Sequence, residues 1–381
     1  MLLSIAIVSC LIWIYLAAAH GGFWRINPFI ASAASAAKNS IPVVAVVPAR
    51  DEADVIARCI SSLLLQHRTA VQVVLIDDSS SDGTASVAVA AAGAVNLAHR
   101  LHVIPGLPLA AGWSGKLWAV QQGVEAALRF NPGFILLTDA DIVHAPDNIP
   151  RLIAHAESGN YDLVSLMVKL HCQSFAERAL IPAFVFFFLM LYPPSWIANP
   201  RRKIAGAAGG CILIRPDALR KAGGIAAIRH EIIDDCALAA RVKRSGGRVW
   251  LGLAPDTHSV RPYTSFPAIG RMISRAAFNQ LQHSTLLLLV AILGLAITYL
   301  APPALLLSHH VVPALLGAAT WLLMAMCFWP TVKLYGLNPL WTLLLPAIAL
   351  FYMGATVHSA FKFWTGKGGE WKGRVQDPVK P

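Results

Sequence analysis

The chain has 381 residues, of which 56% are hydrophobic and only 13% are charged. Soluble globular domains carry about 25% charged residues, so the composition excludes a wholly water-soluble protein and places part of the chain in lipid. The formal net charge of +11 suits an anionic membrane surface. The basic residues are scattered and show no zinc-ligand spacing, which argues against nucleic acid as a partner.

The N-terminal segment is an uncharged apolar run from Leu2 to Ala19, about long enough to cross a bilayer core. A cleaved signal peptide is the alternative, but such a peptide carries positive charge before its apolar stretch. Here Arg25 and Lys38 follow the stretch instead. We therefore predict a transmembrane anchor at residues 1–20, with the N-terminus outside and the following chain in the cytoplasm.

Residues 42–275 show an alternation of expected strands and helices. Strands are expected at 43–47, 71–76, 102–104 and 134–137, and a helix at 116–130. This alternation predicts an α/β domain whose central, mostly parallel sheet is covered by helices on both faces. Ligands of such sheets bind at the carboxyl ends of the strands, where the acidic clusters of this sequence lie.

Four further apolar segments follow in chain order. The stretch from Ala179 to Tyr192 is shorter than a bilayer span, so it is either a helix lying in the membrane interface or a buried core helix. Segments at about 285–307, 311–330 and 339–361 predict a C-terminal transmembrane region at 284–361. Three full spans would put the basic tail at 362–381 outside, whereas its charges favour the inside. If one of the three segments is re-entrant or interfacial, the chain crosses the membrane fewer times and the basic tail lies inside.

Two loops at strand ends offer groups that can hold a nucleoside. Pro48, Arg50 and Glu52 follow the first strand, and Asp77 and Asp78 follow the second. Carboxylates at these positions can accept hydrogen bonds from a base N–H and from ribose hydroxyls. We therefore expect a nucleotide to bind at this edge of the sheet.

An acidic pair, Asp139 and Asp141, flanks Ala140 at the end of the strand at 134–137. Alternation along a strand would send both side chains to one side, where hard oxygen ligands can hold Mg²⁺ or Mn²⁺. Such an ion stabilises the charge that develops on a departing diphosphate. Lys116 is either a further positive charge near the phosphates or a solvated lysine in the first turn of a helix.

A second acidic pair, Asp234 and Asp235, precedes a predicted helix that runs through Arg241. A carboxylate at this position can cap the helix or can serve as a general base. We expect the capping role for Asp234. We expect Asp235 to take the proton from the acceptor hydroxyl.

In this order and spacing the motifs resemble the inverting GT-A-fold glycosyltransferases of family 2, close to the ceramide glucosyltransferases. More narrowly, the chain is similar to the hopene-associated glycosyltransferases of hopanoid-producing bacteria, over nearly its whole length. The motifs that carry the resemblance are Asp77–Thr84, Gly112–Lys116, Asp139–Asp141, Gly209–Cys211, Asp234–Asp235 and residues 371–374.

The resemblance implies a GT-A domain that uses a nucleotide sugar, expected to be a UDP-sugar, and a membrane lipid as acceptor, such as a hopanoid. It implies a catalytic domain on the cytoplasmic side of the inner membrane, with other lipid-biosynthesis enzymes as candidate partners. It also implies acceptor-side positions at Trp113, Gly209, Gly210 and Asp234.

Two departures from the family pattern stand out. The pair at 234–235 reads Asp-Asp where Glu-Asp is usual. The later Gln/Arg-x-x-Arg-Trp motif is reduced to Met272–Ala276, which keeps Arg275 as a phosphate-facing candidate but lacks the Trp of the acceptor wall.

Three other functions remain open from the residues alone. A polyprenyl-phosphate sugar transferase and a nucleotidyltransferase acting on lipids would share the acidic clusters. A transporter or membrane scaffold whose soluble domain only binds a nucleotide would share them too. A processive polymer synthase fits less well, because it would carry an intact Gln-x-x-Arg-Trp motif and more membrane spans.

Overall fold

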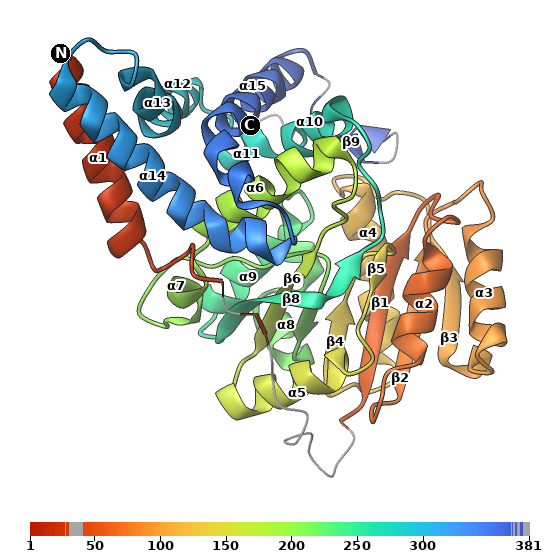
Figure 1. Ribbon diagram of the computed structural model, residues 1–381. Coiled ribbons are helices and arrows are strands. Elements are labelled where there is room, and N and C mark those ends of the chain that lie inside the picture. The colour runs from red at the N-terminus through yellow and green to blue at the C-terminus, as the bar shows by residue number, and fades with distance from the viewer. Residues whose placement is uncertain (27, 30–40, 367, 369, 372–373, 376–381) are drawn as a thin grey trace. The chain divides into compact units, whose positions relative to one another are not determined.

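The computed structural model describes residues 1–381 except 27, 30–40, 367, 369, 372–373 and 376–381 (Figure 1). The chain forms two compact units. The helical unit contains residues 1–26, 172–195 and 262–370, and the α/β unit contains residues 27–171, 196–261 and the segment from 371 onward. Half of the basic tail expected at 362–381 lies outside the described residues, as does Lys38.

The α/β unit is built on an eight-stranded sheet in the order β3-β2-β1-β4-β7-β6-β8-β5. Its strands are β1 Val43–Ala49, β2 Val71–Asp77, β3 Leu101–Pro105, β4 Phe134–Leu137, β5 Ile142–Val143, β6 Leu163–Lys169, β7 Ile212–Ile214 and β8 Val249–Ser259. Parallel pairs join β3, β2, β1 and β4, and also join β6 to β8, whereas β7 and β5 run antiparallel to their neighbours. The expected mostly parallel sheet is confirmed, and the four expected strands correspond to β1, β2, β3 and β4.

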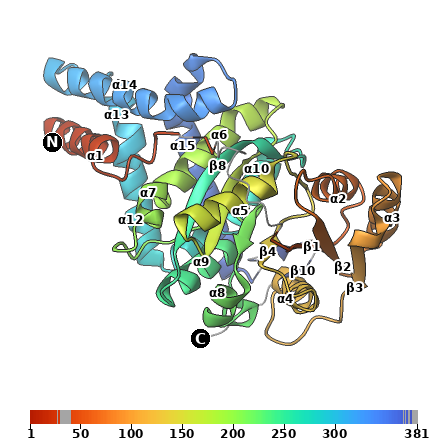
Figure 2. The ribbon, with the colours of Figure 1, turned by 90° about the horizontal axis from the view of Figure 1, so that it is seen from below.

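Helices cover both faces of the sheet in the α/β unit. They are α2 Ile56–Leu64, α3 Thr84–Ala94, α4 Gly115–Leu128, α5 Asn148–Gly159, α8 Pro216–Lys221 and α9 Asp234–Arg244, with short turns at Ala98–Arg100 and Ile225–Ile228. Figure 2 shows α2 and α3 on one face of β1 and β2, and α4 on the other. Every residue of β1 is buried, as expected for a strand covered on both sides.

Close packing of α4 on this sheet depends on Gly123. A Cβ at that position would lie 2.4 Å from Cγ1 of Val46 on β1. Any larger residue would therefore push the helix away from the strand. This contact keeps α4 close to β1, and the first turn of the same helix carries Lys116.

The helical unit contains most of the apolar segments. Its helices are α1 Leu2–Ala18, α6 Phe175–Leu191, α10 Phe266–Ser274, α11 Ala277–Gln280, α12 Thr285–Leu295, α13 Ala301–Leu305, α14 Val311–Leu334 and α15 Leu345–Trp364, with a π-helical turn at Ala296–Leu300 and a 3-10 turn at Pro339–Leu344. The short helix α7, Pro194–Ala198, lies where the two units join in sequence, and the short strands β9, Glu370–Trp371, and β10, Arg374–Val375, follow α15.

Four helical stretches among the described residues are long and apolar enough to cross a membrane: Phe175–Ala198, Thr285–Leu305, Val311–Leu334 and Pro339–Trp364. The last three agree with the segments expected at the C-terminal end. The first corrects an expectation, because the helical stretch around Ala179–Tyr192 begins earlier and ends later, so its length does not exclude a span. Helix α1, by contrast, is apolar but shorter than the four.

Polar contacts fix α6 within its own unit. Ser174 and Glu177 form a capping box at its start, and the buried Glu177 carboxylate also accepts a 2.6 Å hydrogen bond from the Tyr263 backbone N–H. The Tyr352 hydroxyl on α15 donates to the Leu180 carbonyl at 2.9 Å. A buried carboxylate needs several such donors, so the start of α6 has one strongly favoured position.

Candidate active site

The site begins at the carboxyl ends of three adjacent strands. In the sheet β1 lies between β2 and β4, with Ala49 opposite Asp77 and Val46 opposite Leu137. The loops that leave these strands therefore emerge side by side, as the parallel topology requires.

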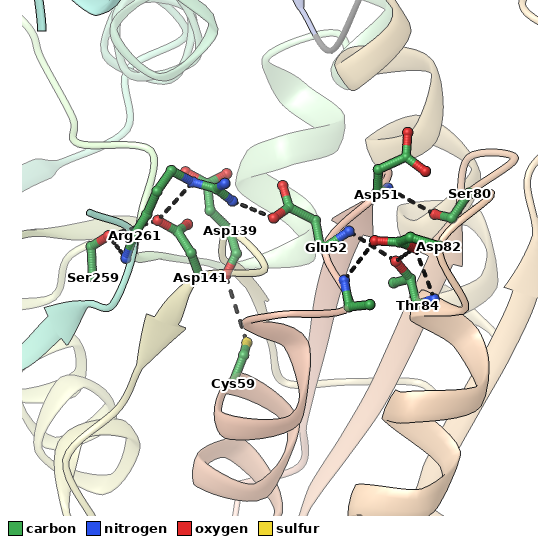
Figure 3. A network of polar contacts seen from close by, with 11 residues as sticks. Asp51, Glu52, Cys59, Ser80, Asp82, Thr84, Asp139, Asp141, Ser259 and Arg261 are labelled. Atoms are coloured by element: carbon green, nitrogen blue, oxygen red, sulfur yellow. Dashed lines mark hydrogen bonds and ion pairs between the residues drawn. The ribbon is translucent and has the colours of Figure 1, made fainter. Parts of the chain in front are cut away.

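The loops after β1 and β2 are joined by reciprocal hydrogen bonds (Figure 3). The Asp51 N–H donates to Ser80 Oγ at 3.0 Å, and the Ser81 N–H donates back to Asp51 Oδ1 at 2.8 Å. The Ala53 N–H donates to Asp82 Oδ2 at 2.9 Å. The carboxylates of Asp51 and Asp82 thus accept hydrogen bonds that hold the two loops together, and their role is structural.

The expected nucleoside-binding residues lie in these same loops. Arg50 donates from Nη1 to the Asp78 carbonyl at 2.8 Å and lies 3.6 Å from its carboxylate. Asp78 is only 3% exposed, so its carboxylate is mainly a partner of Arg50. Asp77 Oδ1 accepts the Ser80 N–H at 3.1 Å, and Pro48 lines the pocket described below.

The acidic pair lies in a turn, and this corrects the expected geometry. Strand β4 ends at Leu137, so Asp139 and Asp141 follow the strand and its alternation does not orient them. A turn closed by the Ile142 N–H and the Asp139 carbonyl, 3.3 Å apart, places them instead. Burial raises the pKa of the Asp139 carboxyl, and the charge of Asp141 adds to this rise, against the opposing effect of Lys116.

Lys116 belongs to the site. It lies in the first turn of α4, and its Nζ is 2.9 Å from Asp139 Oδ1 and 3.4 Å from Asp234 Oδ2. Only 21% of its side chain is exposed, so it is not the solvated lysine that was the alternative. It places a positive charge between the two acidic pairs.

Arg261 was not singled out from the sequence, although it contacts two expected residues. It follows β8, forms an ion pair with Glu52, and brings its Nε within 3.4 Å of Asp141 Oδ2 (Figure 3). The Ser259 hydroxyl donates to the same Asp141 oxygen at 2.6 Å. The signal that could have revealed both residues is their place at the end of a strand, in the run Ser259-Val260-Arg261.

Asp235 is held by two backbone N–H groups. The Gly209 N–H donates to its Oδ2 at 2.8 Å, and the Cys236 N–H donates to its Oδ1 at 2.7 Å. Burial raises the pKa of Asp235 to about 6, and the charge of Asp234 adds to this rise. The carboxyl therefore loses its proton close to neutral pH, which suits a general base.

Asp234 does not have the expected capping role. Ile233 occupies the N-cap position of α9 and no side chain caps this helix. Asp234 is instead the first residue of the helix, where its carboxylate contacts Lys116. The favourable dipole of the helix start remains, but the side chain serves the ion pair.

The glycine turn at 209–210 lies against Asp235. A Cβ on Gly209 would lie 3.4 Å from Asp235 Oδ2 and 3.7 Å from Lys116 Nζ. A Cβ on Gly210 would meet Ile142 and Val168 side chains at 3.2 Å. Gly209 therefore keeps the space beside the carboxylate open, and Gly210 allows the turn to pack closely on Ile142 and Val168.

A buried hydrogen-bond chain supports this turn. The Thr138 hydroxyl donates to the Gly210 carbonyl at 2.8 Å and lies 3.0 Å from His144 Nε2. Because that hydroxyl proton is used, His144 Nε2 must donate, and its Nδ1 then accepts from Asn148 Nδ2 at 3.0 Å. Burial lowers the pKa of His144 to about 3, so the ring stays neutral. These hydrogen bonds tie Thr138, next to Asp139, to the glycine turn whose N–H contacts Asp235.

The loop at 112–115 reaches the residues before Asp234. Ser114 caps α4, and its backbone N–H donates to the Arg229 carbonyl at 3.0 Å. Trp113 packs against Trp118 with ring centroids 5.2 Å apart. Arg275 is the C-cap residue of α10 and belongs to the helical unit. It is therefore not one of the residues that the α/β unit brings together at this site.

One pocket collects the main groups. Lys116, Asp139, Gly209, Asp234 and Asp235 line it, together with Pro48 and apolar residues of β1, β4, α4 and α9. The described residues contain no group of three or more His, Cys, Asp or Glu side chains placed to hold a metal. Two carboxylates nevertheless fit Mg²⁺, which is often bound by one or two carboxylates plus substrate phosphates. Asp139 and Asp141 are such a pair, and their mutual repulsion would be relieved by a cation.

Comparison with known proteins agrees with this fold. Residues 44–223 match the glycosyl transferase family 2. No curated relative matches the sequence. The match at 44–223 confirms the expected enzyme class, a glycosyltransferase.

One solved structure shares the fold at low identity. The mannosyltransferase PcManGT from Pyrobaculum calidifontis, solved with GDP-Man and Mn²⁺, is 16% identical with a TM-score of 0.58, over 95% of this chain and 99% of that one. Glucosyl-3-phosphoglycerate synthase from Mycobacterium tuberculosis, also 16% identical, has a TM-score of 0.39 over 63% and 78% of the chains, too low to add to the argument. The likeness to the mannosyltransferase supports the α/β fold alone.

Proposed function

We propose that this chain, whose residues 44–223 match the glycosyl transferase family 2, transfers a sugar from a nucleotide-sugar donor to a membrane lipid with inversion at the anomeric carbon. The observation that carries the proposal is one pocket at the carboxyl ends of the strands, lined by Asp235, Lys116 and Asp139. It combines a carboxylate suited to take a proton with a charged group suited to a phosphate.

In this mechanism Asp235 takes the proton of the acceptor hydroxyl, which attacks the anomeric carbon as the diphosphate leaves. The raised pKa of Asp235, about 6, supports this role because a base with a pKa near the working pH is the most effective. Lys116 stabilises the phosphates. Asp139 and Asp141 would hold Mg²⁺ or Mn²⁺, which supplies Lewis-acid stabilisation of the leaving group when bound. No covalent nucleophile takes part.

The proposed donor is a UDP-sugar, as the sequence resemblance implies. The Pyrobaculum calidifontis mannosyltransferase was solved with GDP-Man and Mn²⁺, which makes GDP-mannose the second donor to test. The loops that carry Arg50, Asp77 and Asp78 are the proposed nucleoside-binding elements, with Arg275 as a proposed phosphate contact from the helical unit.

The proposed acceptor is a membrane lipid, and a hopanoid is the lipid that the resemblance implies. Four helical stretches long and apolar enough to span a bilayer support an acceptor that stays in the membrane. Trp113, Gly209, Gly210 and Asp234 are the proposed acceptor-side residues. We propose that the enzyme lies in the inner membrane with its catalytic domain in the cytoplasm.

The test is release of nucleoside diphosphate by the purified protein in detergent with Mg²⁺ or Mn²⁺. UDP-sugars and GDP-mannose are each paired with extracted bacterial lipid, with a purified hopanoid, and with polyprenyl phosphate, alongside an Asp235→Asn control. Metal-dependent release that needs lipid and is lost in the control is the expected result, and the anomeric configuration of the product should be inverted.

Each other outcome names a different function. Release with polyprenyl phosphate alone would identify a polyprenyl-phosphate sugar transferase. Tight nucleotide binding without release from any donor would identify a binding protein instead of an enzyme that acts on lipids. A product of retained configuration would contradict the role of Asp235.

A further inference from the structure

Two basic residues of the site, Lys116 and Arg261, each contact one carboxylate of the pair Asp139 and Asp141 and one carboxylate outside that pair. On one side Lys116 Nζ lies 2.9 Å from Asp139 and 3.4 Å from Asp234. Lys116 is therefore shared between Asp139 of the first acidic pair and Asp234 of the second.

The other side has the same arrangement. Arg261 contacts Asp141 through Nε at 3.4 Å and forms an ion pair with Glu52 (Figure 3). Its Nε approaches the same Asp141 oxygen that accepts the Ser259 hydroxyl at 2.6 Å. A divalent cation that bound Asp141 in this state would meet a guanidinium at close range.

We propose that Arg261 and Lys116 are exchangeable counter-ions, which neutralise the acidic pair before the donor binds and move to the donor diphosphate when it arrives. The move frees oxygens of Asp139 and Asp141 for the divalent cation. Glu52 and Asp234 keep the two basic side chains within reach while they change partners. This inference rests on the proposed function, because it assumes a diphosphate donor and a metal at this site.

Charge explains why the two ligands would bind together. In the contacts above, four carboxylates face two basic side chains, so a diphosphate alone brings negative charge to a negative site. A metal ion alone meets Lys116 and Arg261. Coupling of this kind makes each ligand raise the affinity of the other by the same factor.

The test measures Mn²⁺ binding from the electron paramagnetic resonance signal of free Mn²⁺, using the full chain in detergent. Titrations are made without nucleotide and then with UDP or GDP. Arg261→Gln should bind Mn²⁺ alone about fivefold or more tightly than the natural chain, and the enhancement by nucleoside diphosphate should shrink. Arg261→Lys keeps the charge and should stay close to the natural chain.

A matched control separates this effect from a general loss of charge. Arg215 follows β7 at the opposite edge of the sheet, where its partner is Glu157. Arg215→Gln removes the same charge outside the site and should change the affinity for Mn²⁺ alone by much less than Arg261→Gln. Equal effects of the two substitutions, or an unchanged or weaker affinity in Arg261→Gln, would overturn the proposal.

A second variant decides the matter if Arg261→Gln does not fold. Glu52→Gln removes the outer partner of Arg261, so the guanidinium should stay on Asp141, weaken binding of Mn²⁺ alone and enlarge the enhancement by nucleotide. Tighter binding of Mn²⁺ alone in Glu52→Gln would contradict the exchange.

Failure of the proposed function gives a different pattern. If the natural chain binds no Mn²⁺ with either nucleotide and releases no diphosphate, both proposals fall. If it is a metal-dependent transferase whose Arg261→Gln variant binds Mn²⁺ alone as the natural chain does, only the exchange falls.

Discussion

The two acidic pairs of the site are held in different ways. Asp139 and Asp141 are held by the long side chains of two basic residues, whereas Asp235 is held by the backbone N–H groups of Gly209 and Cys236. A side-chain ion pair can change partners at small cost, but a backbone donor cannot leave its carboxylate without local unfolding. The half of the site proposed to bind the donor is therefore adjustable, and the half that carries the proposed base, Asp235, is fixed.

The largest expected effect is in the adjustable half. Asp141→Asn should lower turnover by at least about a thousandfold, because loss of metal-assisted stabilisation costs several kcal/mol in the transition state. Affinities for donor and Mn²⁺ should fall together, measured by calorimetry. Asp217→Asn, on the exposed surface of α8, is the matched control and should change neither. Full turnover in Asp141→Asn would rule out the metal role.

A substitution of Asp235 should lower the reaction rate without lowering the affinity for ligands. Asp235→Asn should lower turnover by about 10²- to 10⁴-fold, the range for loss of a general base. Affinities for nucleotide and Mn²⁺ should stay close to those of the natural chain, because Asp139 and Asp141 are unchanged. If donor affinity fell as far as in Asp141→Asn, the two halves would not be independent.

The pH dependence tests the same carboxylate without substitution. Because the pKa of Asp235 is raised to about 6, the base is ionised above that pH and protonated below it. We expect kcat/KM to be level above about pH 6 and to fall about tenfold per unit below it. Asp234→Asn removes a neighbouring charge that raises this pKa, so the inflection should move to lower pH. A profile that stays level down to pH 5 would contradict Asp235 as the base.

The smallest expected effect is steric. Gly209→Ala would place a methyl group 3.4 Å from the Asp235 carboxylate and should slow turnover about three- to tenfold by displacing it slightly. Gly93→Ala on α3 is the control, since nothing lies within 4 Å of its added Cβ. Both variants should keep the natural melting temperature within about 2 °C. Equal rates in the two variants would show that the base tolerates this shift.

Much of the α/β unit was predictable because its strands are short apolar runs, and charged residues follow or end three of them, β1, β2 and β4. The ends of β1, β2 and β4 place Arg50, Asp78 and Asp139 at one edge of the sheet, as expected from parallel topology. These predictions depend only on local pattern and on a general rule of sheet topology. The apolar C-terminal segments were also predictable from local pattern, because each is a long run of apolar residues.

The side-chain partners were not predictable, because they depend on long-range geometry. Arg261 is distant in sequence from both Glu52 and Asp141, and nothing local marks it as their partner. Asp234 looked like a helix cap, but Lys116 offered its carboxylate a better contact. The strand alternation expected for Asp139 failed because β4 ended two residues earlier.

The buried chain from Asn148 through His144 and Thr138 to Gly210 has a consequence for recovery after acid exposure. Burial lowers the pKa of His144 to about 3, so mild acid protonates Asp235 long before it reaches this ring. Between about pH 4 and 6 the proposed base Asp235 should therefore be protonated while the hydrogen bonds that join Asn148, His144, Thr138 and Gly210 are kept. Inactivation in that range should be fully reversible, and activity should return as soon as the pH is raised, without a refolding delay.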